Sequence, residues 1–281
     1  MKLKLLIILT LLLTILPTKS TLAETVSFDT PITMKVNGVY IKTSNEPYLY
    51  KGLTYVPIRF VSEALGAEEI SWNGAKRICR IYDDGTEILL TIGKNTATVN
   101  GKSAKIQGSV MLTQDRTYVP IRFVAETFGA QVNWNKNTYT ADIKKEGISV
   151  PSHLKGSLPY GDDDIYWLSR IVNAESGAEP MYGKIAVANT VLNRVESKDF
   201  PNTIYGVIFD KKYGIQYQPA MNGTIYNTPS GDSIIAAKRA LRGENIVAES
   251  MYFLNPRLAT NFWIPQNRKF FATIGNHDFY L

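Results

Sequence analysis

The sequence predicts an α+β fold in two parts, a duplicated β-rich module followed by a mainly helical domain. The segment "TYVPIRFVSEALGA" at 54–67 recurs as "TYVPIRFVAETFGA" at 117–130, with eleven of fourteen positions identical. Residues 146–161 then lose hydrophobic periodicity and gather Pro, Gly and Ser, which is typical of a linker. Residues 162–195 carry apolar side chains at helical spacing. The duplication and the change in composition therefore divide the chain into two parts.

The first 23 residues have the composition of a secretory signal peptide. Lys2 and Lys4 precede an apolar run over 5–17, and "TLAE" at 21–24 offers small residues for cleavage after Ala23. The run is shorter than the about 20 residues of a membrane-spanning helix, so no stable membrane span is expected after processing. A retained N-terminal anchor is the alternative. Removing the three lysines before residue 24 lowers the formal charge from +6 to +3, and no basic run indicates a nucleic-acid partner.

Cysteine and histidine are too few for most metal or redox sites. Cys79 is the one cysteine, and its setting in "RICRIY" predicts a buried strand residue. The two histidines, His153 and His277, stand apart from any Cys/His/Asp cluster with metal-ligand spacing. We expect no metal and no cofactor.

Each copy of the repeat contains the signals of one short helix beside hairpins. Pro57 and Pro120 suit the first helical position, apolar residues follow at helical spacing, and Gly66 suits a left-handed helix end. Asn37-Gly38 and Asn100-Gly101 predict tight hairpins. A tryptophan follows each copy (Trp72 and Trp134), and we expect both to be core residues.

This half resembles the copper-amine-oxidase N-terminal-like (stalk) domain over about residues 30–145, since both copies match its "YVPLRFVxExLGA…V.W" pattern. The segment contains no histidine, so nothing in it would hold copper. The resemblance implies a rigid spacer or a module that contacts other wall polymers or proteins. A dedicated carbohydrate-binding face is the alternative.

The second half places an acidic residue on the apolar side of a helix. Ile165, Leu168, Val172 and Glu175 follow at spacings of three and four, so Glu175 falls on the buried stripe. Gly177 ends this helix, and a second begins after Glu179-Pro180. Burial would raise the pKa of Glu175 and keep it protonated near neutral pH, as glycosidic cleavage requires of a general acid. The alternative is a helix-end residue with its head in solvent. Glu179, at a helix N-terminus, is expected to be ionised and to cap.

Residues 163–281 resemble the catalytic domain of the SleB-type cell-wall (spore-cortex-lytic) hydrolases. The matching stretches, in family order, are "NAESGAEPMYGKIAVANTVLNRVES", "FPNTIYGVIF", "QYQPAMNG", "MYFLNP" and "IGNHDFY". The resemblance implies a lysozyme-like, largely helical fold, action on peptidoglycan glycan strands, and Glu175 as the catalytic acid. Ala174 stands where the family usually has glycine, and Ser176-Gly177-Ala178 separate the two acids.

The number of carboxylates separates two mechanisms. Hydrolysis commonly uses two, whereas a lytic transglycosylase needs one, because the C6 hydroxyl of muramic acid is a tethered nucleophile. No second acid is evident, since Asp199, Asp210 and Asp232 occupy loop or turn contexts typical of capping. Transglycosylation is therefore favoured.

The resemblance also implies substrate-binding residues. Gln216 and Tyr217 match the family's "QF" site, and Tyr252 and Asn255 lie in "MYFLNP". For each, core packing or turn formation is the alternative. Aromatic residues that suit a glycan groove, or else the core, are Trp263, Tyr205, Tyr213 and Tyr226. His277 has no obvious partner and is interpreted as a packed C-terminal histidine, with a catalytic role as the alternative.

Together these observations predict a secreted, cell-wall-associated lytic transglycosylase that cuts the MurNAc–GlcNAc bond of peptidoglycan, in the wall or the spore envelope. The alternatives are a lysozyme-type muramidase or glucosaminidase on the same scaffold, and a non-catalytic peptidoglycan-binding protein. The predicted parts are a signal peptide at 1–23, a duplicated stalk domain at 24–145, a linker at 146–161 and a hydrolase domain at 162–281.

Overall fold

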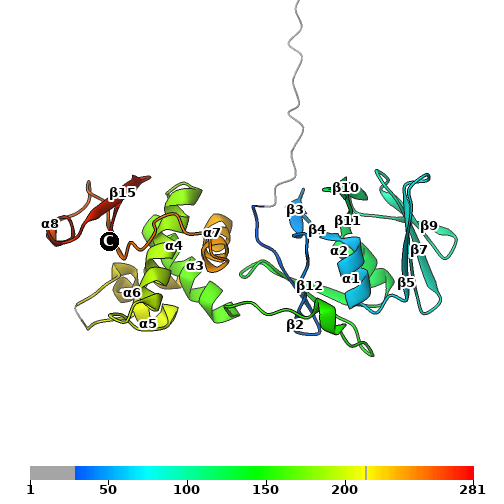
Figure 1. Cartoon of the computed structure of the whole chain (residues 1–281), viewed down its shortest axis with the longest axis horizontal. Helices are drawn as coiled ribbons and strands as arrows, with labels where there is room; N and C mark the ends of the chain where they lie inside the picture. The colour runs from blue at the N-terminus through cyan, green and yellow to red at the C-terminus, as the bar shows by residue number, and fades with distance from the viewer. Residues whose placement is uncertain (1–28, 213) are drawn as a thin grey trace, which may run out of the picture.

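A computed structural model describes residues 29–212 and 214–281, so the predicted signal peptide lies outside the described residues. A β-rich lobe and a helical lobe lie side by side (Figure 1). The predicted α+β architecture in two parts is confirmed. Within the described ranges, no helix combines the length and apolar composition needed to cross a membrane.

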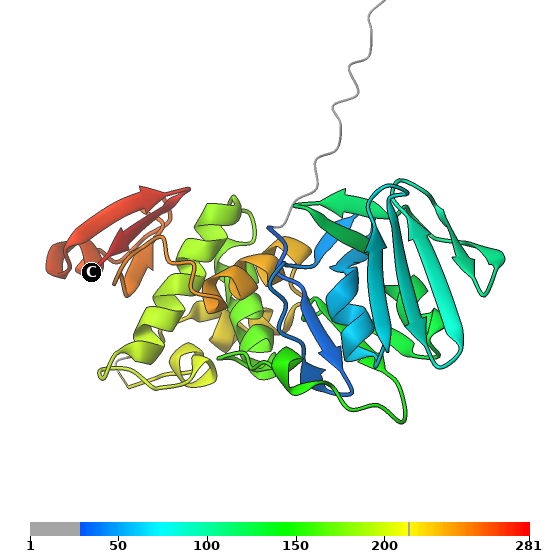
Figure 2. The ribbon, with the colours of Figure 1, turned by 45° about the vertical axis from the view of Figure 1, so that its right-hand side comes forward.

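The β-rich lobe, called here the stalk module, packs short strands around the helices α1 (Ile58–Ala64) and α2 (Ile121–Thr127). Its strands are β1 (Thr33–Val36), β2 (Val39–Tyr40), β3 (Tyr48–Tyr50), β4 (Leu53–Pro57), β5 (Glu69–Asn73), β6 (Ile78–Asp83), β7 (Thr86–Thr91), β8 (Thr96–Val99), β9 (Lys102–Lys105), β10 (Met111–Thr113), β11 (Arg116–Pro120), β12 (Gln131–Asn135) and β13 (Thr140–Lys144). They form sheets in the orders β10-β11-β4-β3, β12-β13-β1-β2 and β5-β6-β7-β8-β9. Figure 2 shows the last of these as a separate layer beside α1.

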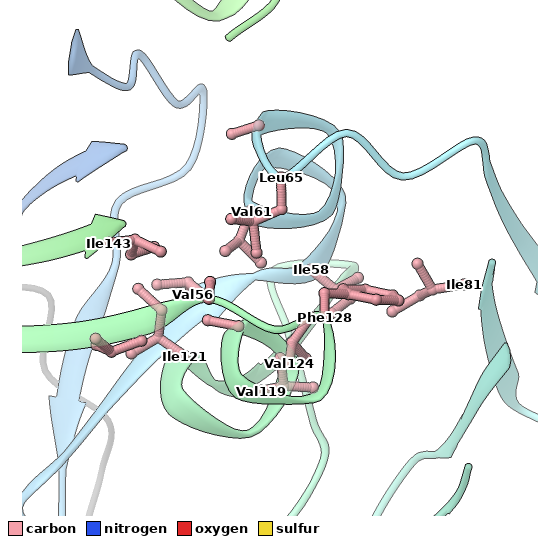
Figure 3. Close-up of a cluster of buried hydrophobic side chains, with 14 of the residues drawn as sticks. Val56, Ile58, Val61, Leu65, Ile81, Val119, Ile121, Val124, Phe128 and Ile143 are labelled. Atoms are coloured by element: carbon pink, nitrogen blue, oxygen red, sulfur yellow. The ribbon is translucent and has the colours of Figure 1, made fainter. Parts of the chain in front are cut away.

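The two copies of the repeat pair through equivalent residues. In the antiparallel pair of β4 and β11, Val56 lies opposite Val119, its counterpart in the other copy. The helix that follows each strand returns to this pair, and Val61 and Val124 are fully buried beside it (Figure 3). The duplication therefore builds one shared core, in which each copy covers the apolar face of the other.

The predicted turns are confirmed. Asn37 and Gly38 have φ values of 49° and 79° between β1 and β2, and Asn100 and Gly101 have 48° and 76° between β8 and β9. Positive φ at both central residues is the type I′ geometry, which matches the twist of the flanking strands.

The prediction that the prolines start the helices is off by one residue. Pro57 and Pro120 end β4 and β11 and stand at the cap positions, so that α1 and α2 begin at Ile58 and Ile121. Gly66, with φ of 91°, ends α1 in the left-handed conformation as predicted.

The core prediction holds for Cys79 and is wrong for the two tryptophans. Cys79 is buried in β6, and burial raises the pKa of its thiol to about 11. Trp72 and Trp134 are 49% and 37% exposed. Their strands, β5 and β12, are the edge strands of their sheets, so each indole covers only part of its neighbour and leaves one side open to solvent.

The helical lobe, residues 162–281, is built on three packed helices, α3 (Asp162–Ser176), α4 (Met181–Glu196) and α7 (Gly231–Leu241). Its other elements are α5 (Ile204–Ile208), α6 (Gln218–Asn222), the 3-10 turn η2 (Thr224–Tyr226), β14 (Tyr252–Leu254), α8 (Trp263–Asn267), β15 (Phe270–Ile274) and β16 (His277–Tyr280). The strands form a sheet in the order β14-β16-β15 at the far end of the lobe (Figure 1). Apolar residues of α3, α4 and α7 make one buried core.

Part of the predicted linker packs onto the stalk module. Val150 and Leu154, the latter in the 3-10 turn η1 (Ser152–Leu154), are buried in the stalk core, and Lys42 N donates to Leu154 O at 2.9 Å. The domain limits stay a prediction. Part of the segment predicted as a linker is packed against the stalk module rather than free of it.

Polar contacts join the two lobes. The fully buried ammonium of Lys238, on α7, donates to Thr33 Oγ1, Thr138 O and Tyr139 O at 3.0, 2.6 and 3.0 Å. Arg242 donates to Glu46 Oε2 at 2.9 Å. Every N–H of the Lys238 ammonium thus has an acceptor in the stalk module, which fixes α7 against it.

Candidate active site

Glu175 lies in the last turn of α3, where the sequence places it. Three aspartates open this helix, and Asp164 accepts the Gly161 N–H at 2.8 Å, so acidic groups occupy its positive end. Ile165, Leu168 and Val172 are buried along the stripe that leads to Glu175. The helix ends at Ser176, with Gly177 at the cap position, where a Cβ would lie 2.5 Å from Asn173 O.

The environment of Glu175 favours its protonated form. The side chain is half-buried, and burial raises its pKa to about 7, while the positive charge of Arg194 opposes part of this rise. In the described part of the chain, no group donates a hydrogen bond to its carboxyl. Both oxygens are therefore available to a substrate.

Arg194, in the last turn of α4, joins the predicted substrate-binding residues. Its Nε donates to Met251 O at 2.7 Å and its Nη1 to Gln216 Oε1 at 3.3 Å. The guanidinium carbon lies 5.3 Å from the ring centroid of Tyr217 and 5.4 Å from that of Tyr252. One buried cation thus brings together two segments, 216–217 and 251–252, that are far apart in sequence.

Gln216 and Tyr217 enter this cluster from the loop before α6. Gln216 Nε2 donates to Gly214 O at 3.2 Å, which holds the amide toward Arg194. The Tyr217 ring is buried, and its hydroxyl makes no hydrogen bond of good geometry to a described residue. Burial raises the pKa of Tyr217, Arg194 lowers it and the charge of Glu175 raises it, so this hydroxyl lies within electrostatic reach of both.

Tyr252 belongs to the cluster, whereas Asn255 does not contact it. The Tyr252 hydroxyl accepts from Arg268 Nη2 at 2.9 Å, and its ring centroid lies 6.5 Å from that of Trp263. Asn255 Oδ1 accepts the Arg257 N–H at 3.0 Å and closes a turn. A substrate role for Asn255 stays a prediction. In that role its side-chain NH2 group would donate to the substrate.

Arg194 is the residue that sequence reasoning missed. Its signal was a cation at the end of the apolar run of α4, where a charged side chain needs buried partners. The partners come from residues 216, 217, 251 and 252, so the helical pattern alone does not identify them.

Two parts of the chain match models of known protein families. Residues 35–143 match the family model of the copper amine oxidase N-terminal domain, and residues 178–280 match that of the cell wall hydrolases. The chain therefore joins a copper amine oxidase N-terminal domain to a cell wall hydrolase domain. The second match begins three residues after Glu175.

Curated relatives carry the name spore cortex-lytic enzyme. One from Bacillus cereus is 36% identical over 158 residues, covering 54% of this chain and 56% of the relative. One from Halalkalibacterium halodurans is 36% identical over 138 residues, covering 49% and 41%. The chain thus spans about half the length of the curated relatives it matches. A solved catalytic domain of the germination-specific lytic transglycosylase SleB from Bacillus anthracis is 36% identical, with a TM-score of 0.41, covering 45% of this chain and all of that one.

In the cell wall hydrolase domain, Glu179 has a different role from the predicted helix cap. Its carboxylate accepts the backbone N–H of Asn276 at 3.0 Å and the Asn276 side-chain amide at 2.8 Å, while Pro180 stands at the cap position of α4. Burial raises the pKa of Glu179, but the hydrogen bonds from Asn276 and the charges of His277 and Lys184 outweigh it and lower the pKa overall. The expected ionisation is therefore confirmed, and the capping expectation is wrong.

His277 is buried, as predicted, but it has a neighbour that the sequence did not reveal. Its Nδ1 lies 3.8 Å from Glu179 Oε1, and its ring packs edge-on against Phe253. Burial lowers the pKa of His277, so the neutral imidazole is favoured. The name corner clasp is used here for Glu179, Asn276 and His277. The corner clasp holds the turn between β15 and β16 against the bend that follows Glu175.

Three of the remaining aromatic positions lie at the surface. The side chains of Tyr205, Tyr226 and Trp263 are exposed, and Tyr213 lies outside the described residues. Asp210 Oδ1 accepts the Lys212 N–H at 2.9 Å, and Asp232 lies in the first turn of α7, as expected of turn and capping residues. Among residues 29–212 and 214–281, no three His, Cys, Asp or Glu side chains gather as metal ligands would.

Proposed function

We propose that this chain is a lytic transglycosylase that cleaves the MurNAc–GlcNAc bond of peptidoglycan and leaves a 1,6-anhydro-MurNAc end. The single observation that carries the proposal is the state of Glu175. It is a half-buried carboxyl with a pKa of about 7, no hydrogen-bond donor among the described residues, and one buried cation within electrostatic reach.

The chemistry needs a group that gives and then takes one proton. Glu175 first protonates the glycosidic oxygen, and the bond from that oxygen to C1 of the muramic acid breaks. The resulting carboxylate then accepts the proton of the C6 hydroxyl as its oxygen bonds to C1, so Glu175 ends as it began. A pKa near the working pH suits both halves of this cycle.

The residues around Glu175 have separate tasks in this scheme. Arg194 stabilises the carboxylate that exists between the two proton transfers, since opposite charges attract strongly where water is excluded. Gln216 positions the sugar beside the acid. Tyr217 is buried and acts through the guanidinium of Arg194, which also contacts the ring of Tyr252. Because the nucleophile belongs to the substrate, no second carboxylate is needed.

The names of the relatives support spore cortex as the form of peptidoglycan attacked, and they support a secreted, wall-associated location. The test is digestion of purified cortex and vegetative peptidoglycan by the wild type and by Glu175→Gln, followed by mass spectrometry of the fragments. We expect anhydro-muropeptides, lighter than reducing ends by one water, with the wild type only. Reducing ends at MurNAc would assign a muramidase instead, and full activity of Glu175→Gln would exclude this residue as the acid.

A further inference from the structure

A groove in the stalk module has the chemistry of a binding site. It encloses about 510 Å³ between β4 of the first repeat and α2, β12 and β13 of the second. Its lining includes the indole of Trp134, the amide of Gln107 and the basic side chains of Lys105, Arg122 and Lys136. A cavity of this size accommodates a small ligand or two to three sugar rings of a longer polymer.

Trp134 lines this groove with part of its indole exposed. It is 37% exposed although it is one of the largest apolar side chains in the module, and its other contact is edge-on to Tyr139, with ring centroids 5.6 Å apart. Its counterpart in the first repeat, Trp72, is also exposed but does not line this groove.

The charges around Trp134 favour an anion. Arg122 and Glu126 pair with each other, with Nη1 and Oε1 2.9 Å apart, and so neutralise one another. Lys105 and Lys136 are exposed and form no ion pair within the described residues, which leaves the groove with two uncompensated positive charges. Two free cations beside an open indole complement a sugar that carries carboxylates.

We propose that this groove binds a carboxylate-bearing glycan, namely the peptidoglycan strand with the carboxylates of its stem peptides. Trp134 stacks on the apolar face of a sugar ring, and Lys105 and Lys136 pair with the carboxylates. The choice of peptidoglycan rests on the proposed function, whereas the requirement for a flat sugar face and negative charge follows from the groove. The stalk module then acts as a second glycan-binding site beside the catalytic one.

The test measures binding of the full chain to insoluble peptidoglycan by sedimentation, in a Glu175→Gln background that prevents cleavage. Trp134→Ala is compared with Trp72→Ala, the equivalent tryptophan outside the groove. The pair Lys105→Gln and Lys136→Gln is compared with Lys94→Gln and Lys102→Gln, which are exposed lysines of the same module that do not line it. Thermal unfolding of each variant checks that it is folded.

We expect Trp134→Ala to weaken binding about tenfold, as the loss of one stacked ring does. The double variant Lys105→Gln and Lys136→Gln should weaken binding by a similar factor and make binding less dependent on salt. Both controls should bind within about twofold of the parent protein. Equal binding by Trp134→Ala and Trp72→Ala would overturn the proposal. So would binding of polyphosphate, a polyanion without sugar rings, as tight as that of peptidoglycan.

Soluble glycan fragments too short to reach both sites separate this proposal from the catalytic one. Their cleavage by the chain with active Glu175 should be the same for Trp134→Ala and Trp72→Ala. If no variant cleaves any glycan while Trp134→Ala still weakens binding, the proposed activity fails and the groove stands. If cleavage occurs and Trp134→Ala binds peptidoglycan normally, the groove fails and the activity stands.

Discussion

Arg194 and Glu175 form the central electrostatic pair of the cell wall hydrolase domain. The guanidinium lowers the pKa of the carboxyl, but burial raises it by more, so the net pKa is about 7. Arg194 is itself held by Met251 O and by Gln216 Oε1, which fixes the charge in place. The acid is therefore neither fully ionised nor fully neutral at physiological pH.

Removal of the Arg194 charge should move the pH profile of cleavage. In Arg194→Met the pKa of Glu175 rises further, so the alkaline limb of the rate profile shifts to higher pH, and kcat falls by about tenfold or more because the carboxylate intermediate is no longer stabilised. Arg194→Lys, which keeps the charge, should shift the limb less. Steady-state rates between pH 5 and 9 test this. An unshifted limb in Arg194→Met would mean that another group sets it.

Glu175 should lower stability at the pH where it works. Its folded pKa of about 7 lies above the ordinary glutamate pKa of 4.5, so the folded chain binds this proton more tightly than the unfolded chain does. The resulting stabilisation is present below pH 4.5 and is lost as pH rises through 7. At pH 8 we expect the free energy of unfolding of Glu175→Gln to exceed that of the wild type by about 2 kcal/mol. At pH 4 the two values should differ little. Denaturant titrations at the two pH values measure it, and a pH-independent difference would contradict the raised pKa.

The corner clasp should be sensitive to a single methyl group. Gly275 has φ of 63°, and a Cβ there would overlap Glu179 Oε2. Gly275→Ala should therefore destabilise the domain by about 2–3 kcal/mol, because the Glu179 carboxylate must leave its hydrogen bonds. Glu179→Ala should cost a similar amount, and the double variant less than the sum of the two. Exposed Glu249→Ala serves as the control. Additive effects in a denaturant-based double-mutant cycle would show that the two positions act separately.

Lys238 should make the junction between the lobes depend on pH. Burial lowers the pKa of its ammonium from 10.5 to about 7, so the unfolded chain binds this proton more tightly between those values. The free energy of unfolding of the wild type should rise with pH in that window, by about 1 kcal/mol per unit, relative to Lys238→Met. Parallel curves for the two proteins would show that Lys238 keeps an ordinary pKa.

Local patterns predicted much of the fold. The 63-residue repeat, the Asn-Gly turns and the helix that leads to Glu175 depend on neighbours in sequence, and each was recognisable there. The exposed Trp72 and Trp134 were not, because the alternation of a strand does not reveal whether that strand lies at a sheet edge.

The candidate site was only partly predictable for the same reason. Glu175 could be placed because its burial follows from one helical stripe. The corner clasp joins Glu179 to Asn276 across 97 residues, and the Arg194 cluster draws on two loops and a strand. Contacts of this kind are made by tertiary packing between distant segments. The periodicity of a single segment does not reveal them.

The source of the oxygen at the new sugar end tests the central claim most directly. Peptidoglycan is digested by the wild-type chain in water enriched in ¹⁸O, and the muropeptides are weighed by mass spectrometry. Attack by the C6 hydroxyl predicts anhydro ends without ¹⁸O, all of them absent from the Glu175→Gln digest. Reducing ends that carry ¹⁸O would show that water is the nucleophile and would contradict catalysis by one carboxyl alone.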